Sequence, residues 1–342
     1  MAPLFFSLST ALYERKRHNF MVTLSIIIVN WNTCGYLRRC LKSIRAEVTA
    51  LTYEVIVVDN ASRDNSLSML ATEFSDVKVV ANSENRGFAS ANNQGIALAS
   101  GKYLLLLNPD TEIRDDALGR MVAYLNSHPE VGAVGPRLTL PDGTIQTGAA
   151  GFDPSPSALF NYAFMLHALF PKSLRGIWLT KKHYRLSEEI DVDWVGGACL
   201  MMRSSAIKHV GTLNSGFFMY AEDIELCYRI KKAGWHVRCL SDIRVVHYLG
   251  GSTKQKGQRF IKQNITGLDF YYRSRFSKPK VALMHVWGTI GFTLRAVMYR
   301  FMVWIHKKSK YAERMRIMQK CALSSLHYLI LLIAPSKEGM KQ

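Results

Sequence analysis

The chain has 342 residues, of which 48% are hydrophobic and 20% are charged, and this balance excludes a disordered or low-complexity protein. Its six cysteines include no C-x-x-C pair, so a disulfide-stapled scaffold and a zinc ribbon are excluded as well. The 44 Lys and Arg residues outnumber the 26 Asp and Glu residues by 18. Such an excess is typical of proteins with a polyanionic partner, either nucleic acid or an anionic membrane.

The positive charge is concentrated in the C-terminal part of the chain. Residues 1–250 carry 26 basic and 23 acidic side chains, whereas residues 251–342 carry 18 basic and 3 acidic ones. The same C-terminal part contains two uncharged, apolar runs of 14 and 16 residues, at 281–294 and 321–336. Each run is shorter than the ~18–20 residues that a membrane-spanning helix needs. We therefore expect residues 253–342 to form a basic, apolar, helical extension that lies on an anionic membrane surface.

Two ordinary core helices with a solvated basic face are the alternative for this C-terminal part. At the other end, residues 1–20 are expected to form an accessory arm, because their basic cluster at 15–17 follows the apolar segment, whereas a signal peptide has the opposite order. Without export, the cysteines are expected to be reduced and cytoplasmic.

Residues 24–135 alternate between short apolar runs, typical of strands buried on both faces, and segments with helical periodicity. The expected strands are 24–29, 54–58, 77–80 and 103–107. The expected helices are 35–45, 65–74 and 88–99. This alternation predicts a doubly wound, mainly parallel α/β sheet flanked by helices, in which ligands bind at the carboxyl ends of the strands.

Polar residues follow each expected strand. They are amides and two carboxylates, and they are expected to converge on one edge of the sheet: Asn30, Asn32, Asp59, Asn60, Asn85, Asn108 and Asp110. The sequence has neither G-x-G-x-x-G nor G-x-x-x-x-G-K-[ST], so neither a dinucleotide-binding turn nor a P-loop is predicted.

After residue 135 the pattern changes. A hairpin is expected over 137–148, turning at Pro141-Asp142-Gly143. Residues 149–190 are interpreted as a variable insert. They are followed by a loop that enters a buried strand at 193–202, a helix that begins at Glu222-Asp223, and a strand over 244–247 that ends in a histidine.

Seven sequence motifs occur in order between residues 24 and 252: IIIVNWN, VIVVDNAS, NRGFASANNQG, LLLLNPDTE, WVGGACLMMR, FFMYAEDIELCYR and VVHYLGGS. With these motifs the chain resembles the inverting glycosyltransferases of family 2, which have the GT-A fold, and within them the bacterial rhamnosyltransferase-like enzymes. The resemblance implies a glycosyltransferase domain over 21–252, with a nucleotide-sugar-binding half at 21–135 and an acceptor and catalytic half at 136–252. It does not cover residues 1–20 or the basic extension.

The resemblance implies that Asp59 accepts a hydrogen bond from the pyrimidine of a nucleotide-sugar donor and that Asn30 frames the base. Asp59 and Asn60 could equally cap the following helix when the dipeptide is taken alone. Other residues of the matching motifs are implied to bind the donor, partly by closing over the nucleoside: Asn32, Asn60, Asn85, Gly87, Asn93 and Asn108.

The resemblance also implies a divalent cation, Mg²⁺ or Mn²⁺, held by Asp110 and His247. Hard oxygen ligands and an imidazole suit these ions. The first acid of the family's metal motif is an amide here, Asn108, which departs from the family pattern. A lone histidine such as His247 is otherwise more often an ordinary core or surface residue.

Asp223 matches the family's general base, which would deprotonate the acceptor hydroxyl for a single inverting displacement. Acidic residues in a first helical turn are also common for electrostatic reasons alone. Glu222, Trp194 and the pair Gly196-Gly197 are expected to shape the sugar and acceptor pocket, since paired glycines permit close backbone approach.

The implied function is transfer of a sugar, most simply from dTDP-rhamnose, to a lipid-linked glycan in bacterial surface polysaccharide assembly (O-antigen, capsule or cell wall). The expected place is the cytoplasmic face of the inner membrane. Alternatives are a UDP-hexose or UDP-N-acetylhexosamine transferase of the same family, a basic nucleic-acid-binding protein, and a non-catalytic assembly protein. A nucleotidyltransferase would need a Gly-rich, basic loop after the first strand, and residues 30–35 (NWNTCG) are not one. We expect no nucleic-acid partner, because the one basic and aromatic patch considered for such a role, at 271–276, lies beside the apolar runs. The sequence leaves the oligomeric state open.

Overall fold

A computed structural model describes residues 22–170, 176–186, 188–249 and 257–334. The predicted arm at 1–20, the Gly250-Gly251-Ser252 end of the last motif and the first residues of the predicted extension lie outside the described residues, as do residues 335–342.

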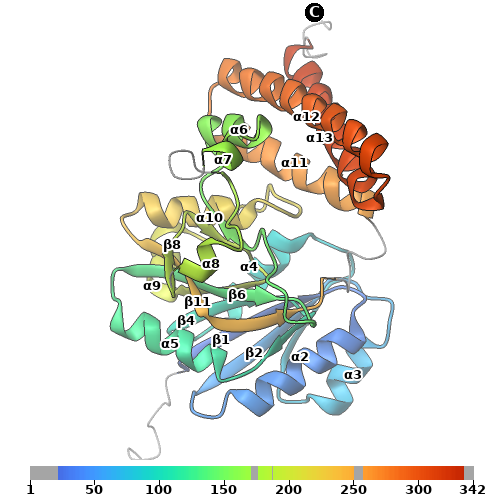
Figure 1. The fold of residues 1–342 in the computed structure, drawn as a ribbon. Coiled ribbons are helices and arrows are strands. Elements are labelled where there is room, and N and C mark those ends of the chain that lie inside the picture. Colours follow the sequence, from blue (N-terminus) through green and yellow to red (C-terminus); the bar gives the residue numbers. More distant parts are fainter. Residues whose placement is uncertain (1–21, 171–175, 187, 250–256, 335–342) are drawn as a thin grey trace, which may run out of the picture.

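The described part of the chain contains a nine-stranded mixed sheet in the order β3-β2-β1-β4-β10-β6-β11-β5, with β8 paired to β11 (Figure 1). Its strands are β1 (Leu24–Asn30), β2 (Tyr53–Asp59), β3 (Lys78–Ala81), β4 (Tyr103–Leu107), β5 (Thr111–Ile113), β6 (Val131–Thr139), β8 (Glu189–Asp191), β10 (Cys199–Arg203) and β11 (His236–His247). A second, two-stranded sheet pairs β7 (Ala150–Gly151) with β9 (Trp194–Val195). The first four strands run parallel, and β10 runs antiparallel to both of its neighbours.

The predicted doubly wound α/β architecture is confirmed. Alternate side chains of β1 enter two separate clusters, because successive residues of a strand face opposite sides of the sheet. Ile26 and Ile28 pack into one cluster with α2 (Cys34–Glu47) and α5 (Ala117–Ser127). Ile27 packs into the other cluster, beside α4 (Phe88–Leu98). The remaining helices of the sheet domain are α3 (Ser66–Glu73), α9 (Ser204–Val210) and α10 (Glu222–Lys232).

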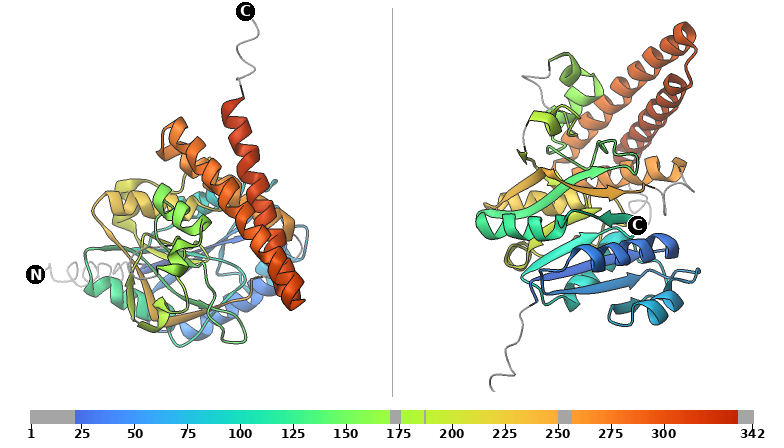
Figure 2. Two further views of the ribbon diagram at one scale, coloured as in Figure 1. Left: turned by 45° about the horizontal axis from the view of Figure 1, so that its top comes forward. Right: turned by 60° about the horizontal axis from the view of Figure 1, so that its bottom comes forward.

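The segment interpreted from sequence as a variable insert carries three short helices: α6 (Pro156–Ala163), α7 (Leu166–Leu169) and α8 (His183–Leu186). Helix α6 packs against α12, and the side chains of both helices belong to the same hydrophobic cluster as α10. The three C-terminal helices are α11 (Gly257–Arg275), α12 (Lys278–His306) and α13 (Ser309–Ile333). They lie above the sheet domain in Figure 1, and Figure 2 shows the α12–α13 pair projecting beyond it.

Helix α12 corrects one sequence-based expectation. The uncharged run at 281–294 was expected to be too short to cross a membrane, but the helix continues through Arg295 and Arg300 and reaches 29 residues. By length and composition alone it is long and apolar enough to span, with a mean hydropathy of 1.3 over 18 residues. The charged side chain of Arg295 is accommodated within this apolar helix because its guanidinium donates to the Tyr162 carbonyl oxygen at 3.0 Å.

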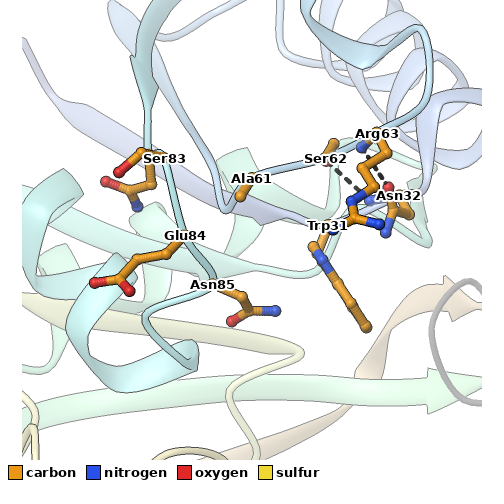
Figure 3. A pocket seen from close by; sticks show the side chains of 9 residues that line it. Trp31, Asn32, Ala61, Ser62, Arg63, Ser83, Glu84 and Asn85 are labelled. Atoms are coloured by element: carbon orange, nitrogen blue, oxygen red, sulfur yellow. Dashed lines mark hydrogen bonds between the residues drawn. The ribbon is translucent and has the colours of Figure 1, made fainter.

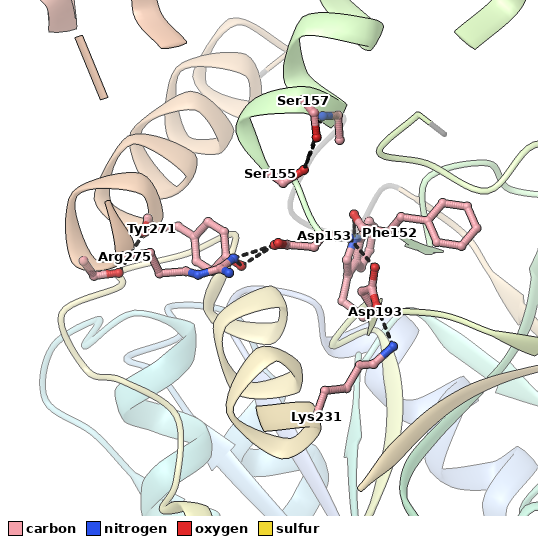
Figure 4. Close-up of polar contacts among 11 residues, drawn as sticks. Phe152, Asp153, Ser155, Ser157, Asp193, Lys231, Tyr271 and Arg275 are labelled. Atoms are coloured by element: carbon pink, nitrogen blue, oxygen red, sulfur yellow. Dashed lines mark hydrogen bonds and ion pairs between the residues drawn. The ribbon is translucent and has the colours of Figure 1, made fainter. Parts of the chain in front are cut away.

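A polar network joins α11 to the sheet domain (Figure 4). The Asp153 carboxylate accepts hydrogen bonds from the Tyr271 hydroxyl, at 2.7 Å, and from the Arg275 guanidinium, at 2.5 Å. That guanidinium also lies 3.6 Å from the ring centroid of Tyr228 on α10, within the range of a cation–π interaction. The network therefore connects the insert, the C-terminal helices and the helix that begins at Glu222.

The crossing of α12 and α6 gives the first prediction. A Cβ built at Gly291 would lie 2.7 Å from Ala163 Cβ and 2.9 Å from the Ala163 carbonyl, so Gly291→Val should lower the free energy of unfolding by about 1–3 kcal/mol. Thermal unfolding checks this. Gly35→Ala in α2, where no atom lies within 4 Å, is the control and should be neutral or slightly stabilising. A Gly291→Val protein as stable as the wild type would contradict the close crossing.

Candidate functional site

Buried polar side chains stand at the carboxyl ends of β1 and β2. The two strands pair in register, so Asn30 lies opposite Asp59, and the Asn30 amide donates to Asp59 Oδ2 at 2.9 Å. Asp59 Oδ1 accepts from the Ser62 backbone N–H at 2.9 Å, and the Thr33 hydroxyl donates to Asn30 Oδ1 at 2.6 Å. Asp59 is 1% exposed. Its bonds thus anchor the segments that follow both strands.

A cavity of about 730 Å³ opens beside this anchor (Figure 3). Its lining residues are Trp31, Asn32, Ala61, Ser62, Arg63, Asn82, Ser83, Glu84 and Asn85. In Figure 3, Trp31, Asn32 and Arg63 stand on one side of it, and Ser83, Glu84 and Asn85 on the other. Asn32 and Ala61 both have left-handed backbone, with φ of 54° and 65°. Such conformations are uncommon outside glycine and cluster at binding sites.

The amide of Asn60 organises the next segment. It donates to Asn85 Oδ1 at 2.9 Å, while its oxygen accepts from the Arg86 N–H at 3.0 Å. The Gly87 N–H donates to Asn85 Oδ1 as well, at 3.0 Å. Gly87 has a φ of 82°, and a Cβ there would meet the Phe218 carbonyl oxygen at 2.6 Å, so only glycine fits.

Asn93 was expected to contact the donor, and the structure gives it a different role. Its amide donates to the Leu213 carbonyl at 2.7 Å and accepts from the Leu213 N–H at 3.0 Å. Both ends of the side chain are thus used to fasten α4 to the segment before α10, so Asn93 positions these elements instead of lining the cavity.

Asp110 and His247 meet across the sheet. His247 ends β11, Asp110 follows β4, and His247 Nε2 lies 3.1 Å from Asp110 Oδ1 with both side chains buried. The Asn108 amide nitrogen lies 3.4 Å from the same Nε2. On the other side of the ring, His247 Nδ1 lies 2.9 Å from Gln146 Oε1.

The pair formed by Asp110 and His247 fits a divalent cation as two of its ligands. A carboxylate oxygen and an imidazole nitrogen facing each other are ligands that Mg²⁺ and Mn²⁺ accept. The described residues contain no cluster of three or more His, Cys, Asp or Glu side chains that could hold a metal. Most ligands would therefore have to be water or substrate oxygens, which is the usual coordination of Mg²⁺.

The carboxylate of Asp223 is held at the start of α10. Its Oδ2 accepts from the Gly197 N–H and its Oδ1 from the Ile224 N–H, both at 2.8 Å. Burial raises the pKa of this carboxyl, and the two backbone hydrogen bonds partly oppose that rise. A base with a raised pKa takes a proton more readily than an exposed aspartate does.

Glu222 is buried beside Asp223, with 4% of its surface exposed. Its Oε2 has no hydrogen-bond partner among the described residues. Burial, and next the charge of Asp223, raise the pKa of Glu222 well above its ordinary value. An isolated buried carboxylate is costly, so the neutral acid is the form that this environment favours.

Tyr220 is a partly buried residue just before α10 whose hydroxyl is influenced by several carboxyl groups. Its hydroxyl has a pKa raised to about 12 by burial and, in decreasing order, by the charges of Glu222, Asp110 and Asp223. Hydrogen bonds bring the segments of Asp110 and Asp223 together: the Asn108 N–H donates to the Ala198 carbonyl at 3.0 Å, and the neighbouring Gly197 N–H donates to Asp223. Tyr220 and Ala221 have left-handed φ values of 71° and 70°, which form the turn that starts α10.

Trp194 was expected to shape the sugar and acceptor pocket, but its side chain is buried in the core instead. It is 2% exposed, its indole N–H donates to the Phe152 carbonyl at 3.0 Å, and its ring packs edge-on against Trp178. Trp194 therefore supports the pocket wall from inside the core. Gly196 and Gly197 do lie beside Asp223, since a Cβ at either would come within 4 Å of Asp223 Oδ2.

Comparison with known proteins decides the family. A family model described as glycosyl transferase family 2 matches residues 25–210, which is more than half of the chain. The chain belongs to this family.

Two rhamnosyltransferases are among the similar proteins. The N-acetylglucosaminyl-diphospho-decaprenol L-rhamnosyltransferase of Mycobacterium tuberculosis is 27% identical over 244 residues, which cover 67% of this chain and 77% of that protein. Rhamnosyltransferase WbbL of Escherichia coli K12 is also 27% identical, over 65% of this chain and 82% of its own. The predicted assignment to the rhamnosyltransferase-like branch, and to glycosyltransferases as enzymes, is confirmed.

Solved structures agree on the fold. The mannosyltransferase PcManGT of Pyrobaculum calidifontis, solved with GDP-Man and Mn²⁺, has a TM-score of 0.57 at 15% identity and covers 95% of both chains. GalNAc-T7, solved with UDP, GalNAc and Mn²⁺, has a TM-score of 0.54 at 18% identity, over 75% of this chain and 51% of its own. At these identities the likeness bears on the GT-A-like fold of this family 2 glycosyltransferase.

Several residues of the site are not among those predicted from the sequence. Trp31, Arg63 and Glu84 line the cavity. The signal for Trp31 and Glu84 was position, because each adjoins a predicted donor-binding residue, whereas Arg63 lies three residues after Asn60. Tyr220 lay inside a matching motif without being selected. Gln146 had no local signal, since it is 101 residues from His247.

The buried Glu222 carboxyl predicts a pH dependence of stability. The folded protein keeps this proton at pH values at which the unfolded chain has released it, so stability falls as pH rises above the ordinary pKa of a glutamate, until the folded carboxyl ionises too. Glu222→Gln removes that titration and should become progressively more stable relative to wild type as pH rises between about 5 and 9.

Thermal unfolding at several pH values measures this effect. The exposed Glu130→Gln is the matched control and should follow the wild type throughout. If Glu222→Gln also followed the wild type over the whole range, the raised pKa would be refuted.

Proposed function

We propose that this glycosyltransferase moves a sugar from a pyrimidine nucleotide-sugar, with dTDP-rhamnose as the first choice, to a lipid-linked glycan. The observation that carries the proposal is that Asp110, which faces His247 Nε2 at 3.1 Å, follows a segment hydrogen-bonded to the one that holds Asp223, through the Asn108 N–H to Ala198 carbonyl bond and the Gly197 N–H to Asp223 bond. The names of its two rhamnosyltransferase relatives support the choice of sugar, and the decaprenol-linked substrate named for one of them supports the choice of acceptor.

The donor nucleoside is proposed to occupy the 730 Å³ cavity. The Trp31 indole offers a flat apolar surface for the base, and Arg63 offers a cation for phosphate oxygens. Asp59 is proposed to receive the pyrimidine N–H, because a carboxylate retains lone pairs after accepting from Asn30 and Ser62. Asn85 and Gly87 close the opposite side. UDP-hexoses and UDP-N-acetylhexosamines remain the alternative donors.

Asp223 is proposed as the general base. It takes the proton of the acceptor hydroxyl as the new C–O bond forms at the anomeric carbon. The bond from that carbon to the diphosphate oxygen breaks in the same displacement, and the diphosphate leaves with the electron pair. Configuration is thereby inverted with no covalent enzyme intermediate. A divalent cation held by Asp110 and His247 would supply Lewis-acid stabilisation of the charge on the leaving diphosphate.

The lipid-linked acceptor is proposed to reach the site from an anionic membrane on which α12 and α13 rest. Twelve of the twenty exposed large apolar side chains among the described residues lie on these two helices. On α12 they follow one face, at Leu283, Ile290, Leu294, Val297, Phe301, Trp304 and Ile305. Basic residues surround the turn between the helices, and a cytoplasmic bacterial membrane carries the complementary charge.

Asp223→Asn should lower sugar transfer by about 10²–10⁴-fold and leave donor binding near the wild-type value, because it removes the base and keeps the side-chain shape. Nucleoside diphosphate release with dTDP-rhamnose, compared with UDP-glucose and UDP-N-acetylglucosamine, measures activity and donor choice together. Lys232→Ala on the exposed face of the same helix is the control. An Asp223→Asn enzyme with full activity would remove Asp223 from the mechanism.

Replacing Val297, Phe301 and Trp304 together by Ser should weaken binding to vesicles that contain anionic lipid by at least ~100-fold, because each buried large apolar side chain contributes about 1.5–3 kcal/mol. Vesicle flotation measures the binding. Serine at Leu67, Val79 and Leu98, which are exposed on the sheet domain, is the matched control. Unchanged binding of the α12 variant, or comparable binding of the wild type to duplex DNA at physiological salt, would show that the surface has another partner.

A further inference from the structure

Gln146 is placed by a short hairpin that the sequence marks with Pro141-Asp142-Gly143. The Thr144 N–H and hydroxyl both donate to Asp142 Oδ1, at 2.9 and 2.7 Å. The Gln146 N–H then donates to the Leu138 carbonyl at 3.0 Å. Because β6 pairs with β11, this returning segment sets the Gln146 side chain next to His247, the last residue of β11.

The contact between Gln146 and His247 fixes which ring nitrogen carries a hydrogen. An amide oxygen can only accept, so Nδ1, at 2.9 Å from Gln146 Oε1, is the nitrogen that donates. In the neutral ring Nε2 then carries the lone pair. That nitrogen faces Asp110 Oδ1 at 3.1 Å and the Asn108 amide nitrogen, a donor, at 3.4 Å.

Two groups that both offer lone pairs therefore face each other across a short, buried gap. Such a pair repels unless a cation or a proton lies between its members. His247 is 6% exposed and Asp110 is 8% exposed, so bulk water does little to weaken this repulsion. The geometry is that of a cation site in which Gln146, on the far side of the ring, orients the His247 imidazole.

We propose that Gln146 is a positioning residue for the divalent cation. It holds the His247 ring in the Nδ1–H tautomer and in the orientation that aims Nε2 at the space beside Asp110. This inference rests on the proposed cation site. Partners behind a ligating histidine generally orient the ring and raise its basicity, and their loss weakens metal affinity by about 10–100-fold.

The test measures Mn²⁺ affinity by the loss of the free-ion electron paramagnetic resonance signal, in the presence of saturating dTDP and, separately, UDP. Gln146→Leu keeps the size of the side chain without the acceptor and should weaken Mn²⁺ binding by about 10–100-fold. Gln146→Glu keeps an acceptor for Nδ1–H and should bind Mn²⁺ at least as tightly as wild type does. The exposed neighbour Thr147→Ala is the control and should match the wild type.

Two outcomes distinguish failure of the Gln146 role from failure of the proposed cation site. If the wild type binds Mn²⁺ and Gln146→Leu binds it equally well, the role of Gln146 is overturned while the cation site stands. If the wild type binds no Mn²⁺ with either nucleotide, the proposed cation site fails and this inference fails with it. Equal thermal stability of the two Gln146 variants and equal dTDP binding without metal exclude misfolding as the cause of a lost affinity.

Discussion

The hydrogen bond between the Asn30 amide and the Asp59 carboxylate holds together the part of the site proposed to bind the donor. Parallel pairing of β1 with β2 sets the two residues opposite each other, and burial makes an unsatisfied carboxylate there prohibitively costly. The Ser62 N–H donates to the other carboxylate oxygen of Asp59, and the Ser62 hydroxyl in turn accepts from the Asn32 N–H at 2.9 Å. The loops after β1 and β2, which form one side of the cavity, are therefore fixed by one desolvated carboxylate.

The other half of the site depends on the start of α10. Two successive left-handed residues, Tyr220 and Ala221, turn the chain so that Glu222 points into the core and Asp223 toward the Gly197 N–H. The Phe88 N–H donates to the Phe218 carbonyl at 2.7 Å, which ties this turn to the start of α4, next to the proposed donor cavity. The proposed base and the proposed donor pocket are thus parts of one hydrogen-bonded frame. The surrounding contacts hold Tyr220 and Ala221 in their left-handed conformations, so the backbone strain next to the proposed base is tolerated.

How much the sequence predicts depends on whether a position is governed by local rules. The strands and helices of residues 24–107 agree with prediction to within about two residues, which is the usual uncertainty of element boundaries. The polar residues after the strands were found because parallel strands bring their carboxyl ends to one edge. Asn93 and Trp194 are predicted to line the pocket from their motifs, but their side chains donate hydrogen bonds to the backbone carbonyls of Leu213 and Phe152 instead. Each of these hydrogen bonds joins segments far apart in the sequence, so neither motif indicates it.

The charge division of the chain has a structural counterpart. The near-neutral sheet domain contains every residue proposed for chemistry, and the basic, apolar surface belongs to α12 and α13. The sheet domain and the C-terminal helices are held firmly together. The Asp153 carboxylate accepts hydrogen bonds from Tyr271 and Arg275 of α11, and the Arg275 guanidinium lies over the ring of Tyr228 in α10. A partly buried guanidinium with a carboxylate, a hydroxyl and a ring as partners is hard to separate, because each lost partner leaves a desolvated polar group. If α12 and α13 rest on a membrane as proposed, this network would hold the proposed base at a fixed height above the lipid, as the proposed transfer to a lipid-linked acceptor requires.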